Sequence, residues 1–248
     1  MSNRLNWLIA RPVAHRGLHD PETKIIENTA SAFAAAIDAR YGIECDLQVS
    51  ADGEAMVHHD AILGRLTEGC ARLDAMSAAA LTRVSFKNTT DRMMTFGDLC
   101  DLVAARATLI VELKSRFDGD LRLVRRVAST LSRYGGPAAA MSFDPAQIAA
   151  LRALAPAITR GVAAQRRPTY RASQDRSARR DATSYFAGLV RAWPQFLAYS
   201  VEELPAALPA IARALFRLPL LAWTVRNTEE RRTAARYADQ MIFEGFRP

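Results

Sequence analysis

The chain has 248 residues, of which 50% are hydrophobic and 24% charged; these are values of a globular protein with a substantial core. Lysine and arginine outnumber aspartate and glutamate by 33 to 26, giving a net charge of +7. The basic residues are spread along the chain without an RNP-type or helix-turn-helix pattern, so we expect no nucleic-acid partner. No apolar stretch reaches the ~18 residues of a spanning helix, so we expect no integral membrane association.

The cysteines and the N-terminus bear on the compartment. Cys45, Cys70 and Cys100 are an odd number without C-x-x-C spacing, which makes a disulfide framework improbable and favours a reducing compartment. The N-terminal apolar run of about four residues is shorter than the ~7 residues of a secretory signal. These features predict a cytoplasmic protein.

Strand and helix patterns alternate along the whole chain. The predicted strands are Pro12–His15, Ile43–Val49, Glu54–His59, Thr108–Leu113, Ala138–Phe143, Thr159–Ala163, Phe196–Val201, Leu218–Thr224 and Gln240–Phe243. The predicted helices are Thr29–Arg40, Thr95–Ala105, Asp120–Tyr134, Pro145–Leu154, Ala178–Trp193, Leu204–Leu215 and Thr228–Tyr237. This alternation predicts a parallel α/β fold, a (β/α)₈ TIM barrel in one domain over residues 1–248. A doubly wound sheet is the alternative, but the chain lacks G-x-G-x-x-G and GxxxxGK[ST] nucleotide-binding signatures.

Two segments interrupt the alternation. Residues Ala61–Arg92 are far longer than the usual connection of about 2–6 residues, and they predict a short insertion after the second and third strands. Residues Gln165–Arg191 contain seven arginines. This second segment is either a solvated face or a lid over an anionic substrate.

Charged side chains occur at alternate positions of two apolar strands. Glu44 and Asp46 point to one face while Cys45 points away, and Glu112 and Lys114 repeat the arrangement. Such carboxylates are costly to bury alone, and a metal ion removes that cost. Three carboxylates form an all-oxygen site that suits Mg²⁺ or Ca²⁺. Taken singly, an E-x-D pattern is more often a salt-bridged strand edge.

Several short motifs become specific when they are taken together and in order. They are His15-Arg16-Gly17, Glu27-Asn28-Thr29, Glu44-x-Asp46, Asp52-Gly53, His59-Asp60, Glu112-x-Lys114 and Trp223-Thr224-Val225. This ordered set resembles the glycerophosphodiester phosphodiesterase family over nearly the whole chain. The last strand departs from the family pattern, because Phe243-Glu244-Gly245 stands where a Thr-Asp pair is usual.

The resemblance implies a TIM barrel enzyme with its site at the C-terminal ends of the strands. It implies that this site hydrolyses small glycerophosphodiesters to an alcohol and sn-glycerol 3-phosphate with a divalent cation. The implied roles are acid and base for His15 and His59, metal ligands for Glu44, Asp46 and Glu112, and substrate-side contacts for Arg16, Glu27, Lys114 and Trp223. Strand alternation indicates that His58 and His59 face opposite ways, without deciding which faces inward.

Several alternatives stay open from the sequence. The nucleophile is a water or a neighbouring glycerol hydroxyl, and either histidine can be the acid, since an unperturbed pKa of ~6.5 allows both forms. A phospholipase-D-like enzyme acting on lysophospholipids or sugar-lipid diesters is one rival function. A barrel that binds phosphodiesters without turnover is the other.

Overall fold

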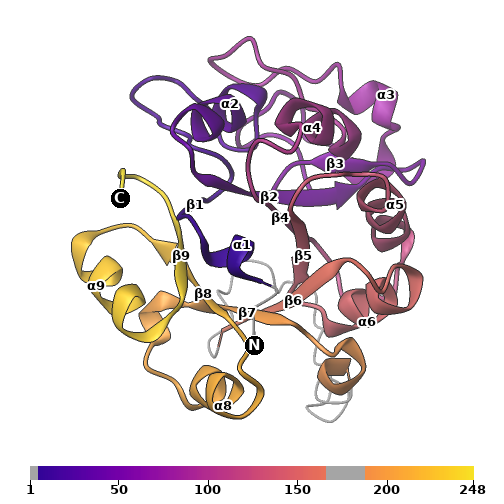
Figure 1. The fold of residues 1–248 in the computed structure, drawn as a ribbon. Helices are drawn as coiled ribbons and strands as arrows, with labels where there is room; N and C mark the ends of the chain where they lie inside the picture. Colours follow the sequence, from indigo (N-terminus) through magenta and orange to yellow (C-terminus); the bar gives the residue numbers. More distant parts are fainter. Residues whose placement is uncertain (1–4, 166–187) are drawn as a thin grey trace.

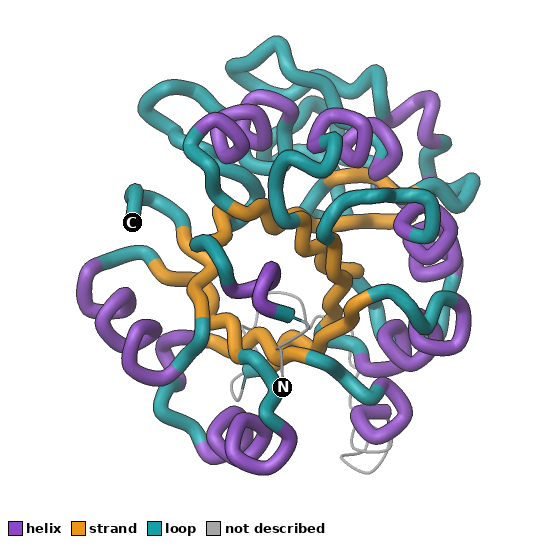
Figure 2. The backbone as a smooth tube through the Cα atoms, in the orientation of Figure 1, coloured by secondary structure: helices purple, strands orange, loops and turns teal. Residues whose placement is uncertain are grey.

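Eight parallel strands close into a barrel in the computed structural model, which describes residues 5–165 and 188–248 (Figures 1 and 2). The barrel strands are β1 (Val13–Ala14), β2 (Gly42–Val49), β4 (Leu109–Leu113), β5 (Ala138–Ser142), β6 (Thr159–Ala164), β7 (Phe196–Ser200), β8 (Leu220–Val225) and β9 (Gln240–Phe243). Pairing of β1 with both β2 and β9 completes the ring. The prediction of a TIM barrel is therefore confirmed.

Helices between the strands cover the outside of the barrel (Figure 2). They include α2 (Ala30–Asp38), α4 (Phe96–Val103), α5 (Arg122–Leu131), α6 (Pro145–Leu154), α8 (Ala207–Phe216) and α9 (Thr228–Tyr237). Side chains of Thr29, Thr95, Asp144 and Asn227 accept backbone N–H bonds at four helix starts, which fixes where each helix begins. The predicted helix Ala178–Trp193 is helical over residues 188–192 and ends before Trp193, while residues 178–187 lie outside the described part of the chain.

The barrel has a packed interior and a separate outer core beneath the helices. The interior is filled by Leu8, Val13, Ile110, Met141, Phe196, Leu221 and Ile242, among others. Leu8 comes from α1 (Asn6–Ile9), a short helix that the sequence did not predict and that lies within the ring in Figure 2. The Thr108 hydroxyl donates to the Trp7 carbonyl and Gln240 to the Ile9 carbonyl. These bonds place α1 at the N-terminal ends of the strands, which leaves the other end for a site.

The third predicted strand is not part of the barrel. Observed β3 (Ala55–Val57) is three residues long and pairs antiparallel with β2 along its outer edge. The segment after it carries the 3₁₀ helix η1 (Leu73–Ala75) and α3 (Ala78–Leu81). Met56, Leu63, Leu73, Leu81, Phe86 and Met93 form a small core of their own. The predicted insertion is therefore a packed substructure on the β2 side of the barrel.

The described helices include none with the length and apolar character needed to cross a bilayer.

Candidate active site

Three carboxylates converge inside the barrel near the C-terminal ends of β2 and β4. Alternation along β2 turns Glu44 and Asp46 inward, and Asp46 is the cross-strand register partner of Glu112 on β4. One oxygen from each of the three side chains lies within 4.8 Å of the others. Glu44 and Asp46 are both 1% exposed. The predicted metal ligands therefore form one buried cluster.

The ionisation of the cluster is uneven. Burial, and then the charges of Asp46 and Glu112, raise the pKa of Glu44 well above its usual range. Burial acts the same way on Asp46, but Lys114 and Arg16 outweigh it and lower the pKa of that carboxyl. Among the described residues, Glu44 Oε1 is buried and has no hydrogen-bond partner. An orphaned oxygen beside two further carboxylates fits a hard divalent cation.

Two cationic side chains balance most of the charge. Lys114 Nζ lies 2.7 Å from Asp46 Oδ1 and 2.8 Å from Glu112 Oε1, and Arg16 Nε lies 3.1 Å from Asp46 Oδ2. Burial disfavours the Lys114 ammonium, but the two carboxylates outweigh burial and raise its pKa. With all groups ionised, three carboxylates and two cations leave one negative charge. A bound divalent cation would make this cluster positive, as capture of a phosphodiester anion requires.

The turn after β1 has the backbone shape that brings Arg16 into the site. Arg16 and Gly17 have φ values of 57° and 80°. A Cβ on Gly17 would lie 2.9 Å from the Ala32 Cβ, so only glycine fits there. The left-handed Arg16 backbone donates its N–H to Glu44 Oε2 at 3.0 Å. The turn formed by Arg16 and Gly17 therefore has two effects. Its backbone N–H orients the Glu44 carboxylate, and it directs the Arg16 guanidinium toward Asp46.

Asn28 anchors the other inward carboxylate of β2. Its Nδ2 donates to Asp46 Oδ2 at 2.9 Å, and the Asp46 N–H donates to Asn28 Oδ1 at 3.2 Å. Asn28 is 1% exposed and has a φ of 57°, a value that asparagine tolerates better than most residues. The Glu27-Asn28-Thr29 segment thus fixes Asp46 and begins α2 with the Thr29 cap.

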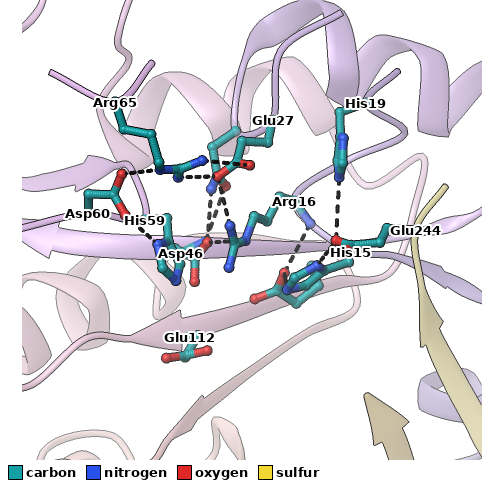
Figure 3. Close-up of polar contacts among 12 residues, drawn as sticks. His15, Arg16, His19, Glu27, Asp46, His59, Asp60, Arg65, Glu112 and Glu244 are labelled. Carbon is teal, nitrogen blue, oxygen red and sulfur yellow. Dashed lines mark hydrogen bonds and ion pairs between the residues drawn. The ribbon is translucent and has the colours of Figure 1, made fainter. Parts of the chain in front are cut away.

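A carboxylate that directly follows the last strand, β9, holds His15. Glu244 Oε2 is in hydrogen-bond contact with His15 Nδ1 and lies 3.6 Å from His19 Nε2 (Figure 3). Arg226 Nε donates to the other Glu244 oxygen at 2.7 Å. Burial lowers the pKa of His15, and the bond to Glu244 opposes that effect. With Nδ1 engaged, His15 Nε2 is free toward the cluster, at 3.9 Å from Glu44 Oε2.

His59 is held in the same manner. Its Nδ1 lies 2.7 Å from Asp60 Oδ1, and Arg65 Nε lies 2.5 Å from the other Asp60 oxygen. Arg65 NH2 continues to Glu27 Oε1 at 2.7 Å, and Arg16 NH1 reaches the same oxygen at 2.7 Å. Figure 3 shows this chain of ion pairs from the insertion to the turn after β1. Both histidines therefore keep Nε2 for chemistry, with Nδ1 fixed by a carboxylate.

The neighbouring histidine faces the other way. His58 is 2% exposed and its ring packs edge-on toward Phe86 in the insertion core. Burial lowers the pKa of His58 to about 4. The structure thus decides between the two adjacent histidines that strand alternation alone had left open.

Aromatic side chains border the opposite part of the opening. The Trp223 ring on β8 meets Phe143, just after β5, edge-on at 5.3 Å between centroids. Phe117, Phe143 and Tyr199 line a cavity of about 650 Å³. Within the described part of the chain, the buried Trp223 Nε1 has no hydrogen-bond acceptor. Trp223 can therefore offer a ligand both an apolar face and one N–H.

Comparison with known families decides the assignment. The model of the glycerophosphoryl diester phosphodiesterase family matches residues 15–244. The chain belongs to this family. No curated protein sequence matches the chain significantly.

Solved structures of glycerophosphoryl diester phosphodiesterases and related enzymes share the fold at low identity. A candidate member from Silicibacter pomeroyi is 22% identical with a TM-score of 0.75, and the match covers 97% of this chain and 93% of the other. A phosphodiesterase from Oleispira antarctica, solved with its product sn-glycerol-3-phosphate, is 18% identical at TM-score 0.75, covering 94% and 91%. The Thermotoga maritima glycerophosphodiester phosphodiesterase is 20% identical at TM-score 0.70, covering 94% of each chain.

Sequence reasoning gave no role to four residues that hold the two histidines. Asp60 appeared only as part of the His59-Asp60 motif, and Glu244 only as a departure from the family pattern. His19 and Arg65 were not singled out. Asp60 directly follows His59 in the sequence, so a signal for that pair was available. Glu244 gave no such signal, because it is 229 positions from His15. Arg65 gave none, because its partners are distant in sequence.

Proposed function

We propose that this enzyme hydrolyses glycerophosphodiesters to an alcohol and sn-glycerol 3-phosphate in a reaction that depends on a divalent cation, Mg²⁺ or Ca²⁺. The observation that carries the proposal is the cluster of Glu44, Asp46 and Glu112 beside two carboxylate-held imidazoles. Membership of the family supports the reaction class. The product in the Oleispira antarctica relative supports the choice of sn-glycerol 3-phosphate.

The phosphate is the part of the substrate that the charged side chains address. Glu44, Asp46 and Glu112 would hold the cation, which would supply polarisation of a phosphoryl oxygen and neutralisation of its charge. Arg16 and Lys114 lie against the same carboxylates, so both donors are positioned before substrate arrives. Such preorganised charge requires little rearrangement as negative charge develops in the transition state.

Proton transfer is assigned to His15 and His59. Each has Nδ1 on a carboxylate, Glu244 or Asp60, so each can take up or release a proton at Nε2. One removes the proton from the attacking hydroxyl, and the other protonates the departing alkoxide. Each such transfer contributes about 10²–10⁴ to rate. The nucleophile is either water or a glycerol hydroxyl, and both routes need this pair.

The remaining residues place these groups. Glu27 accepts from both Arg16 and Arg65 and so connects the phosphate side with the His59 side. Trp223 lines the side of the opening where the alcohol portion leaves, and its ring packs against Phe143. Asp60, Arg65 and Glu244 are positioning residues because they act through the histidines.

The test measures sn-glycerol 3-phosphate released from a panel of glycerophosphodiesters after EDTA treatment, with Mg²⁺ or Ca²⁺ then added back. We expect release to disappear with EDTA and return with a cation. The Glu44→Gln variant should stay inactive at every cation concentration tested, while Glu54→Gln, a rim carboxylate paired with Arg126, should behave as wild type. Release that survives EDTA, or an active Glu44→Gln enzyme, would refute cation dependence at this cluster.

A further inference from the structure

The outer helix α8 is apolar on nearly every side, although it lies at the surface. Its sequence, ALPAIARALF, contains one polar side chain, Arg213. Only Pro209 and Ala212 are buried. The exposed positions are Ala207, Leu208, Ala210, Ile211, Ala214, Leu215 and Phe216. Surface helices normally carry polar residues outward, and a helix that is apolar all round is normally covered.

The apolar surface extends onto the two preceding helical segments. In the described part of the chain, eight large hydrophobic residues are exposed, and seven of them belong to α6, residues 188–193 or α8. They are Leu154, Val190, Trp193, Leu208, Ile211, Leu215 and Phe216, and Ile62 is the eighth. In Figure 1, α6 and α8 lie on the same lower side of the barrel. We call these seven residues the α6–α8 face. Such a concentration marks an interaction surface.

Charge on this face has one sign. Neither α6, residues 188–193 nor α8 with the following Arg217 contains an aspartate or glutamate. The charged residues there are Arg152, Arg191, Arg213 and Arg217. Arg213 is paired with Asp239, while Arg152, Arg191 and Arg217 are exposed. The Arg152 guanidinium lies 5.8 Å from the centroid of the exposed Trp193 ring.

We propose that the α6–α8 face docks reversibly on an anionic lipid bilayer. Exposed aliphatic side chains, an exposed tryptophan and the exposed arginines Arg152, Arg191 and Arg217 are features of a surface that lies in the membrane interface. Anionic headgroups complement the exposed arginines. A second copy of the chain would instead bring like charges together across the contact. The proposal concerns location, and it stands apart from the reaction proposed above.

The orientation would leave the active site open. Leu208, at the start of α8, lines the cavity that also contains Phe143 and Tyr199, so α8 begins beside the substrate-side rim and runs away from it. A bilayer along α8 would lie beside the opening without covering it. Phosphodiesters released at that surface would reach the site over a short path.

The test is co-sedimentation with vesicles of phosphatidylcholine alone or with added phosphatidylglycerol. We expect wild-type protein to bind vesicles that contain phosphatidylglycerol and to be released by salt. The double substitution Leu215→Glu and Phe216→Glu should weaken binding at least about tenfold, because it removes apolar contact and adds repulsion. Arg217→Glu should weaken it about fivefold or more.

Ile62→Glu is the matched control, since Ile62 is similarly exposed but lies outside the face; it should bind as wild type. Thermal unfolding midpoints check that every variant folds. Equal binding by wild type and the double variant, or none by wild type, overturns the proposal. So does a wild-type dimer that the double variant turns into a monomer by light scattering, because a second copy would then cover the face. Binding is read without turnover, so these outcomes are independent of the proposed reaction.

Discussion

The two sides of the barrel opening are built on different physical principles. On the side of β1, β2, β4 and β9, ion pairs and hydrogen bonds connect nearly every charged group, as between Lys114 and Asp46 at 2.7 Å. On the side of β5 and β8, the groups are aromatic, as in the contact of Phe143 with Trp223. The charged side can fix a phosphate and a cation in one geometry. The aromatic side offers shape and apolar surface, and so it suits selection among alcohols.

Removing one charge from the carboxylate cluster should give the largest effect and so tests the role of the charged side most strongly. Asp46→Asn keeps the shape but removes the partner of both Arg16 and Lys114. We expect kcat/KM to fall by about 10³ or more, because several kcal/mol of charge stabilisation depend on the cation and its ligands. Steady-state assays across a cation titration measure this. A variant within tenfold of wild type would contradict the assignment of Asp46.

The histidines come next in size. His15→Ala and His59→Ala should each lower kcat by about 10²–10⁴. His58→Gln is the matched control, since the adjacent ring packs on Phe86 outside the site, and it should change kcat by less than tenfold. Should His58→Gln lose as much activity as His59→Ala, with both folded, the assignment of the inward histidine would fail.

A smaller effect distinguishes positioning from direct participation. Arg65→Met removes the guanidinium that joins Asp60 to Glu27. We expect kcat to fall about 10–100-fold with little change in KM, because the His59 ring loses its fixed orientation while the phosphate groups stay in place. Arg65→Lys should restore only part of the rate, since one ammonium cannot replace the planar fork. A matched Arg126→Met variant should leave kcat unchanged, and equal losses in both would indicate general destabilisation.

The smallest effect is expected on the aromatic side. Phe143→Ala should change kcat by less than about tenfold but alter the order of preference among alcohols, because apolar pocket contacts discriminate by about 1–3 kcal/mol per group. Competition assays between two glycerophosphodiesters measure this ratio directly. If Phe143→Ala lowers kcat for all substrates equally and leaves their ranking intact, the aromatic side does not select the alcohol.

The sequence predicted well wherever a local rule sufficed. Strand periodicity placed Glu44 and Asp46 on one face of their strand and Glu112 and Lys114 on one face of theirs, and strand–helix alternation predicted the barrel. A strand was also predicted over Glu54–His59, of which β3 covers Ala55–Val57, but β-propensity does not reveal that this strand pairs outside the ring. It did not predict α1, whose four residues are held by packing in the barrel and lack a long amphipathic pattern.

Contacts between distant residues were beyond the sequence. Glu244 meets His15 across 229 positions, and the Arg65 contacts with Glu27 span 38. No spacing rule links such pairs, since only the closed barrel and the packed insertion bring them together. The contact between Asp60 and His59 differs, because the two residues are adjacent in the sequence. The His59-Asp60 motif alone is enough to suggest that pair.

The most direct test of the central claim is a crystal structure with Mn²⁺ and sn-glycerol 3-phosphate, using anomalous scattering to locate the metal. We predict one Mn²⁺ bound by Glu44, Asp46 and Glu112, with the phosphate on it and within reach of Nε2 of His15 and His59. A metal bound elsewhere, or a phosphate held away from both imidazoles, would contradict the account.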